Sequence, residues 1–176
     1  MEVIGERIFL RDFRESDFPF YNELEHNMNT YKYESNIPSD EQIKDKFLSI
    51  LSDLDSGPRT KYSFLVCQKF DSTPVGKVTI KLNWSEIREW EIGWALYPDY
   101  WKRGYATEAV KLLIDFAFKN LDAHRIVAYC NAENELSEKI MIRSGMVREG
   151  ILRETKLCNQ KWCNELIYSI LESDWR

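Results

Sequence analysis

The stretch from Trp90 to Asn120 constrains the fold most, because it predicts a strand, a sharp turn and a helix in direct succession. Between residues 90 and 97, large apolar side chains alternate with a second set, Glu91, Gly93, Ala95 and Tyr97, which is the period of a β-strand. Pro98 ends this strand. After the turn, apolar residues recur at helical spacing at Ala106, Ala109, Val110, Leu113 and Ala117. We therefore expect a helix that starts near Gly104 and runs to about Asn120.

The predicted helix start is suited to an anion such as a phosphate group. The first backbone N–H groups of a helix have no intrahelical partners, and they bind a phosphate where small side chains let it approach. Gly104 and Ala106 leave that room. The residues that we expect to hold the anion are Lys102, Arg103, Gly104, Tyr105, Ala106 and Thr107.

This stretch resembles the pyrophosphate-binding motif of the GNAT acetyltransferases, Gln/Arg-x-x-Gly-x-Gly/Ala. Trp101 stands at the first position of the motif, Gly104 at the glycine and Ala106 at the small residue. The series E-I-G-W, P-x-Y-W and G-Y-A-T-E-A is most similar to the RimJ/RimL-like branch, which acetylates protein N-terminal amines and some other amines. That branch commonly has Gly where Lys102 stands, so the turn is expected to be less open here. The competing interpretation is an ordinary strand-to-helix connection with a basic turn.

The rest of the chain agrees with this resemblance. Further strands are predicted at 7–11, 62–70, 75–82, 125–131, 146–157 and 161–171, and further helices from Glu15, from Ser39 and at 134–144. The order β-α-α-β-β-β-α-β-α-β-β is the one expected of the GNAT fold. We therefore expect one α/β (α+β) domain over residues 1–176, with a single mixed, mostly antiparallel twisted sheet of about seven strands and four helices.

The two strands at 90–97 and 125–131 should run parallel, because a crossover helix joins them. In the GNAT fold these strands splay apart at their C-terminal ends, and the pantetheine arm of acetyl-CoA enters the gap. A backbone N–H of Leu96 or Tyr97, next to Pro98, is the expected donor to the oxyanion that forms during acetyl transfer.

Glu91 is the candidate general base, acting directly or through a water. It is the only carboxylate among the alternating residues of its predicted strand that share a face with Gly93 and Ala95. The alternative is a structural glutamate paired with a cation such as Arg88 or Arg125.

A second match lies at Asn134 to Met146 and is similar to the Asn-x-x-Ser segment of the family. The resemblance implies that Asn134 binds the pantetheine and that Ser137 donates a proton to the leaving thiolate. Many GNAT enzymes use a Tyr four residues after this Ser, but Met141 stands there and has no proton to give. Ordinary capping of a helix by Asn134 is the alternative interpretation.

Composition excludes several other classes of protein. A net charge of −5 disfavours a general nucleic-acid binder. Four cysteines without C-x-x-C spacing, and two histidines, support neither a zinc site nor a disulfide framework, so no metal is expected. The N-terminal residues lack the layout of a signal peptide, and no apolar run approaches the length of a membrane span, so we expect a cytoplasmic protein.

The resulting expectation is an acetyl-CoA-dependent N-acetyltransferase that moves acetyl directly to a primary amine. The leading acceptor is the α-amine of a protein N-terminus, ribosomal in type, with recognition by the segment from Asn27 to Ile37. The alternatives are an acetyltransferase for a small polyamine or antibiotic amine, and a non-catalytic acyl-CoA-binding module. No nucleic-acid or membrane partner is expected, and the sequence leaves a homodimer open.

Overall fold

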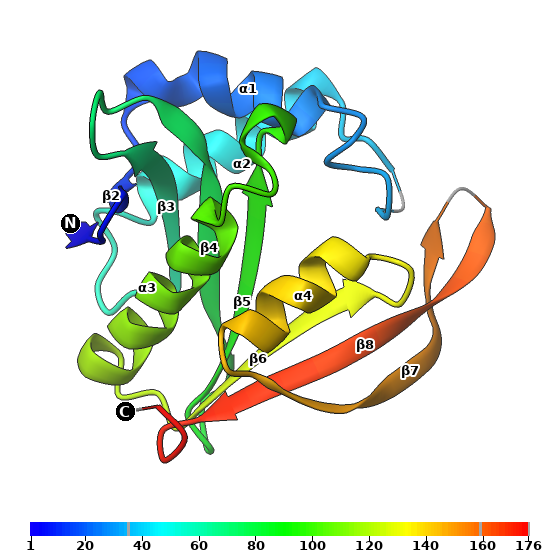
Figure 1. Ribbon diagram of the computed structural model, residues 1–176. Helices are drawn as coiled ribbons and strands as arrows, with labels where there is room; N and C mark the ends of the chain where they lie inside the picture. The colour runs from blue at the N-terminus through cyan, green and yellow to red at the C-terminus, as the bar shows by residue number, and fades with distance from the viewer. Residues whose placement is uncertain (35, 159, 176) are drawn as a thin grey trace.

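A single twisted sheet of eight strands forms the centre of the molecule (Figure 1). The computed structural model describes residues 1–34, 36–158 and 160–175. In chain order the strands are β1 (Glu2–Ile4), β2 (Ile8–Asp12), β3 (Lys61–Gln68), β4 (Pro74–Trp84), β5 (Glu89–Leu96), β6 (Arg125–Asn131), β7 (Val147–Cys158) and β8 (Lys161–Leu171). Their order across the sheet is β1-β2-β3-β4-β5-β6-β8-β7, and all neighbours are antiparallel except β5 and β6.

In the described part of the chain, four α-helices cover the two faces of this sheet. Helices α1 (Phe18–His26) and α2 (Asp40–Ser52) pack on one face, where Leu65 and Cys67 of β3 lie in the same apolar cluster as Phe47. Helices α3 (Tyr105–Asn120) and α4 (Glu135–Arg143) pack on the other face, over the larger core that contains Ile92 of β5 (Figure 1). The apolar stripe of α3 is buried along its length, and this burial fixes the helix against the sheet.

The predicted order of elements is confirmed, with one addition at the N-terminus. The sheet has eight strands rather than about seven, because β1 pairs with β2 from Glu2 to Ile4. A strand of three residues is too short to show an alternating pattern, so the sequence did not reveal it. Helix α2 begins directly after Ser39, as expected, and ends at Ser52.

The parallel pairing of β5 with β6 is confirmed, and it is short. The two strands are paired only at Glu89 with Arg125, Trp90 with Ile126 and Glu91 with Val127. Beyond these positions β5 runs on to Leu96 beside β4, while β6 stays paired with β8 as far as Asn131. Figure 1 shows the two strands diverging upward from this common base. The expected splay therefore begins directly after Glu91.

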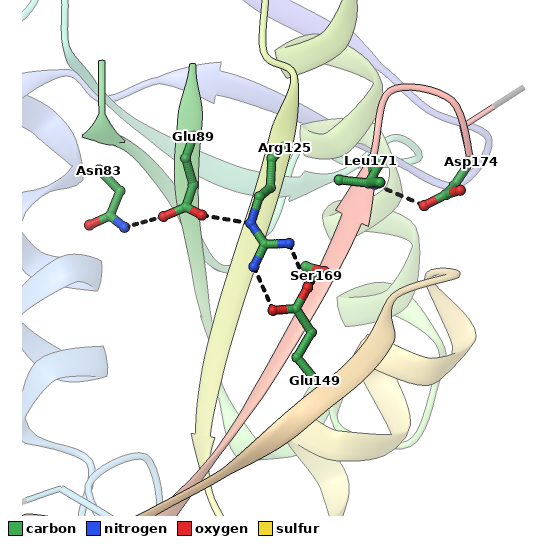
Figure 2. A network of polar contacts seen from close by, with 7 residues as sticks. All are labelled: Asn83, Glu89, Arg125, Glu149, Ser169, Leu171 and Asp174. Atoms are coloured by element: carbon green, nitrogen blue, oxygen red, sulfur yellow. Dashed lines mark hydrogen bonds and ion pairs between the residues drawn. The ribbon is translucent and has the colours of Figure 1, made fainter. Parts of the chain in front are cut away.

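A polar network holds the base of the splay together (Figure 2). The guanidinium of Arg125 donates one hydrogen bond to Glu89 of β5 (2.6 Å) and two to Glu149 of β7, and Ser169 of β8 also donates to Glu149. Asn83 of β4 donates to the second oxygen of Glu89. The hydrogen bonds from Arg125 and Ser169 lower the pKa of Glu149 to about 2. Five neighbouring strands are thus tied together at the point where β5 and β6 separate.

Within the described ranges, no helix has the length and apolar character needed to cross a bilayer.

Candidate functional site

The turn between β5 and α3 is braced from inside by Trp101. Its indole N–H donates to the backbone oxygen of Leu96 at 2.7 Å, so the end of the strand and the turn are held to each other. Trp101 stands at the first position of the resembled motif, and its indole is engaged by the strand. The groups of the turn left to meet an anion are therefore its backbone N–H groups and the side chains of Lys102 and Arg103.

Gly104 has a left-handed backbone, with φ of +83°, and it is the N-cap residue of α3. The positive φ favours glycine here, and a Cβ placed on it would make a tight contact, 3.0 Å, with a guanidinium nitrogen of Arg7. Lys102 also has a positive φ, of 59°. This explains why Gly suits that position, since a lysine pays a conformational cost there.

The first turn of α3 has no side-chain cap. In contrast, Ser39 caps α2 and Asn134 caps α4. The first helical hydrogen bond of α3 runs from the N–H of Glu108 to the oxygen of Gly104 (3.1 Å), which leaves the N–H groups of Tyr105, Ala106 and Thr107 without helical acceptors. Lys102 and Arg103 are exposed beside them. This arrangement of donors and cations fits a diphosphate.

The structure separates the two backbone groups proposed for the oxyanion. The N–H of Tyr97 donates to the oxygen of Val75 on β4 (2.9 Å), so it is engaged within the sheet. Successive N–H groups of a strand point to opposite sides, and the N–H of Leu96 therefore points toward β6. Because β6 pairs with β5 only as far as Glu91, the N–H of Leu96 faces the gap between the splayed strands. Leu96 fits the role of oxyanion donor, and Tyr97 does not.

Glu91 is the last residue of β5 that is paired with β6, so it lies where the gap opens. Its neighbours Trp90 and Ile92 point into the core under α3, and Glu91 therefore faces the α1 side of the sheet. Its carboxylate pairs with Lys81 of β4 at 3.1 Å, and 29% of its side-chain surface is exposed. The alternative partners named from the sequence are occupied elsewhere, Arg88 with Asp122 and Arg125 with Glu89 and Glu149.

Glu91 is also not the only carboxylate on its face. The strand begins one residue earlier than expected, at Glu89, which shares the face of Glu91. Glu89 is buried, however, and bound by Arg125 and Asn83. Glu91 therefore remains the carboxylate of this strand that solvent and a second substrate can reach.

Asn134 and Ser137 lie together in the first turn of α4. The side-chain oxygen of Asn134 accepts a hydrogen bond from the backbone N–H of Ser137 at 3.2 Å, so the capping interpretation is correct for this side chain. Ser137 is half-buried. Met141, one turn further on, is fully buried in the core between α4 and the sheet, which accounts for its apolar character.

We call the face of the sheet that carries Glu91, together with α1 and residues 27–38, the acceptor side; Ser35 within it lies outside the described residues. Lys77 of β4 forms an ion pair there with Glu25 of α1, and the hydroxyl of Tyr31 donates to the other oxygen of Glu25 at 2.7 Å. Burial lowers the pKa of Lys77, although Glu25 opposes this shift. The same segment is tied to β7 by the pair of Lys156 with Glu34, at 2.6 Å.

Two surface hollows border these regions. One, of about 530 Å³, lies between the 27–38 segment and α2 and is lined by Tyr31, Glu34, Asn36, Pro38, Gln42, Asp45 and Lys46. The other, of about 420 Å³, lies beside the turn that precedes α3, which we call the anion turn (residues 101–107), and its lining includes Arg7 and Tyr105. Both are open to solvent, and Glu91 lines neither of them.

Two of the cysteines lie in surroundings that disfavour a reactive thiolate. Cys130 of β6 is buried, and burial raises its pKa to about 12, so the thiol stays protonated at neutral pH. Cys67 is likewise buried, with a raised pKa.

A splayed pair of parallel strands, an uncapped helix start and a carboxylate at the base of the gap define the class of N-acetyltransferases with the GNAT fold. A sequence model of the acetyltransferase (GNAT) domain matches residues 7–147. The chain therefore belongs to the GNAT acetyltransferase family and is an acyltransferase. Acetyl-CoA is the acetyl donor of this family.

Individual relatives agree on the family and differ in what they act on. The Bacillus subtilis protein YnaD, an uncharacterised N-acetyltransferase, is 29% identical over 175 residues, which is 99% of each chain. The ribosomal-protein-S5-alanine acetyltransferase from Vibrio fischeri is 22% identical, with a TM-score of 0.85 over 100% of this chain and 99% of that one. The spermidine N-acetyltransferase from Vibrio cholerae, solved with CoA and spermine, is also 22% identical, with a TM-score of 0.84 over 96% and 98%. At these identities the two solved structures show the fold.

Sequence reasoning missed two residues near the site. Arg7 reaches the anion turn from the start of β2, and Lys77 reaches Glu25 beneath the acceptor side. Neither residue is close in sequence to the group it contacts. Their positions follow from the tertiary arrangement of strands and helices, which the sequence pattern did not supply.

Proposed function

We propose that this enzyme transfers acetyl from acetyl-CoA directly to the α-amine of a protein or peptide N-terminus, as in the RimJ/RimL-like branch. The observation that carries this proposal is that the chain's own cations occupy three of the carboxylates on the acceptor side. Glu25 is paired with Lys77, Glu34 with Lys156 and Glu91 with Lys81. In addition, Glu23 accepts a hydrogen bond from the hydroxyl of Tyr97 at 2.6 Å.

A polyamine carries several positive charges, and a site for it gains affinity from carboxylates that are free to pair with them. Pairing with Glu25, Glu34 or Glu91 would require the internal ion pairs of these carboxylates to break first. A peptide N-terminus has one ammonium group and a neutral backbone, so its binding requires few unpaired carboxylates on the enzyme. The open hollow beside residues 27–38 also suits an extended chain better than a small enclosed cation.

The acceptor's own chemistry is consistent with this choice. An α-amine has a pKa of about 8, whereas the amine of a lysine side chain has one of about 10.4. A single carboxylate such as Glu91 is sufficient to deprotonate the former at neutral pH. We further expect the enzyme to act in the cytoplasm.

In the proposed reaction the amine nitrogen bonds to the acetyl carbonyl carbon, and the bond from that carbon to sulfur breaks. Glu91 receives the proton lost from the amine, directly or through a water. The N–H of Leu96 donates to the carbonyl oxygen as negative charge develops on it. Ser137 gives a proton to the departing thiolate and regains one from solvent. Lys102, Arg103 and the N–H groups of residues 104–107 hold the diphosphate, and Asn134 lies beside the pantetheine.

Release of free CoA thiol, measured with acetyl-CoA and a panel of acceptors, tests this proposal. The panel contains short peptides with free N-termini, the same peptides with blocked N-termini, spermidine and an aminoglycoside. We expect thiol release with the free peptides and almost none with the blocked ones. A higher kcat/KM for spermidine or the aminoglycoside would select the small-amine alternative. Tight CoA binding without release for any acceptor would point to a non-catalytic module.

A further inference from the structure

Arg7 is distant in sequence from the turn between β5 and α3, but it contacts three residues there. Its Nε donates to Glu108 Oε2 at 2.9 Å, and one terminal nitrogen donates to the backbone oxygen of Arg103, also at 2.9 Å. Its guanidinium carbon lies 5.1 Å from the centre of the Tyr105 ring. About half of the Arg7 side chain is exposed.

The contact with Arg103 fixes the direction of one peptide group. In a trans peptide the C=O of residue 103 and the N–H of residue 104 point in opposite directions. Because Arg7 holds the oxygen of Arg103, the N–H of Gly104 must point away from Arg7, toward the open end of α3. A Cβ on residue 104 would lie in tight contact with the same guanidinium, 3.0 Å from one of its nitrogens. Arg7 thus sets the orientation of the Gly104 peptide.

The contact with Glu108 compensates a negative charge in the first turn of α3. Glu108 lies in the first turn of α3, where its negative charge would repel an incoming diphosphate. Arg7 pairs with this carboxylate, and the backbone N–H groups of Arg7 and Ile8 both donate to its other oxygen, at 2.8 and 3.2 Å. The side chain of Glu108 is 16% exposed and is held by these three donors. Its charge is therefore compensated before an anion binds.

We propose that Arg7 is a positioning residue for the diphosphate of CoA. It orients the Gly104 N–H toward the anion and neutralises Glu108, and it does this without entering the reaction. The proposal rests on the assignment of acetyl-CoA as donor. It names a residue that lies about a hundred positions from the motif it serves.

A comparison of two acetyl donors distinguishes a role of Arg7 in diphosphate binding from a role in stabilising the fold. Acetyl-CoA carries the diphosphate, whereas S-acetyl-pantetheine lacks it and keeps the reacting end. For Arg7→Gln we expect the Kd of CoA and the KM of acetyl-CoA to rise on the order of tenfold. The kcat/KM for S-acetyl-pantetheine should stay at the wild-type value.

Arg7→Lys separates charge from geometry. An ammonium can neutralise Glu108, but it lacks the planar fork that reaches Glu108 and the Arg103 oxygen together. We expect a Kd for CoA between those of the wild type and Arg7→Gln. A wild-type Kd in Arg7→Lys would overturn the orienting role. This variant also carries the test if Arg7→Gln does not fold.

Arg11→Gln is the matched control, because Arg11 of β2 makes two hydrogen bonds to Asp17, at 2.7 and 2.8 Å, away from the turn. It should lose stability and leave the Kd of CoA unchanged. An unchanged Kd in folded Arg7→Gln, or an equal loss with both donors, would overturn the proposal. Calorimetry of CoA with the wild type needs no acceptor, so absence of binding there would instead mean that the donor assignment has failed.

Discussion

Glu91 of β5 and Lys81 of β4 lie directly opposite each other on adjacent strands. They form an ion pair of 3.1 Å at the point where β5 and β6 separate. The pair places a carboxylate on the acceptor side of the gap, next to the backbone that runs on to Leu96. It also means that Glu91 has a structural partner, so its catalytic and structural roles must be separated by experiment.

Glu91→Gln should slow acetylation of a peptide N-terminus by roughly 10²-fold, and more at pH 6 than at pH 8. Without a base the rate follows the free-amine fraction, which grows about tenfold per pH unit below an amine pKa of about 8. Rate against pH for wild type and variant measures this. Lys81→Gln is the control, because it breaks the ion pair and keeps the carboxylate. Superimposable profiles for Glu91→Gln and wild type, with a loss of less than about 1 kcal/mol in unfolding free energy, would make Glu91 structural.

Gly104→Glu should abolish CoA binding, since an anionic side chain would meet the diphosphate at a position that already has a left-handed backbone. Gly104→Ala should weaken CoA binding as well, because its Cβ would lie 3.0 Å from Arg7. Calorimetry with CoA measures both effects. The control is Gly150→Ala, whose Cβ would have its nearest contact at 4.0 Å. Wild-type affinity in a folded Gly104→Glu variant would remove the turn from the binding site.

Ser137→Ala should lower kcat by about 10²-fold or more and leave the Kd of CoA nearly unchanged, because a proton donor acts mainly in the transition state. Single-turnover rates measure the first quantity and calorimetry the second. Wild-type turnover in this variant would assign the proton to water or to another residue.

Asn134→Ala tests whether the cap of α4 is also a contact to the pantetheine. Loss of a cap costs about 1 kcal/mol in unfolding free energy, and Ser39→Ala removes the equivalent cap of α2 as a matched control. Both variants should lose similar stability. Only Asn134→Ala should also raise the Kd of CoA, and equal Kd values for the two variants would reduce Asn134 to a cap.

The sequence predicted the elements of this fold well, because most of them have a strong period. The alternation around Glu91 and the helical spacing from Ala106 to Ala117 each reflect one buried face. The turn was predicted from Gly104 for a similar reason, since its conformation is a local property. What the sequence could not supply was pairing between distant strands. The contacts of Lys81 and Lys77 depend on register, and a register shift of one residue would turn each side chain to the other face. The contacts of Arg7 depend on how the residue before β2 is brought against α3.

Glu149 gives a pH dependence of stability that involves no substrate. Its pKa is lowered to about 2 from 4.5 by hydrogen bonds from Arg125 and Ser169. A carboxyl group with a depressed pKa stabilises the fold fully above its unfolded pKa, and this contribution is lost as the pH falls toward the folded pKa. Glu149→Gln should therefore lower the free energy of unfolding by about 1 kcal/mol at pH 7, a modest value because the side chain is partly exposed to screening solvent. Urea unfolding at pH 7, 4 and 3 should show the difference shrinking, whereas a constant difference would assign it to packing.

Lys156→Gln tests the choice of acceptor most directly, because Lys156 occupies the carboxylate of Glu34 on the acceptor side. Its removal leaves Glu34 free to attract a polycation, so the ratio of kcat/KM for spermidine to that for a peptide should rise about threefold to tenfold. The control is Lys119→Gln, which breaks the pair with Asp115 near the far end of α3 and should leave the ratio unchanged. The rise should also shrink at high salt, since exposed charges are screened. An unchanged ratio in Lys156→Gln would mean that the internal ion pairs do not exclude polyamines, and acceptor choice would then depend on the shape of the 27–38 segment.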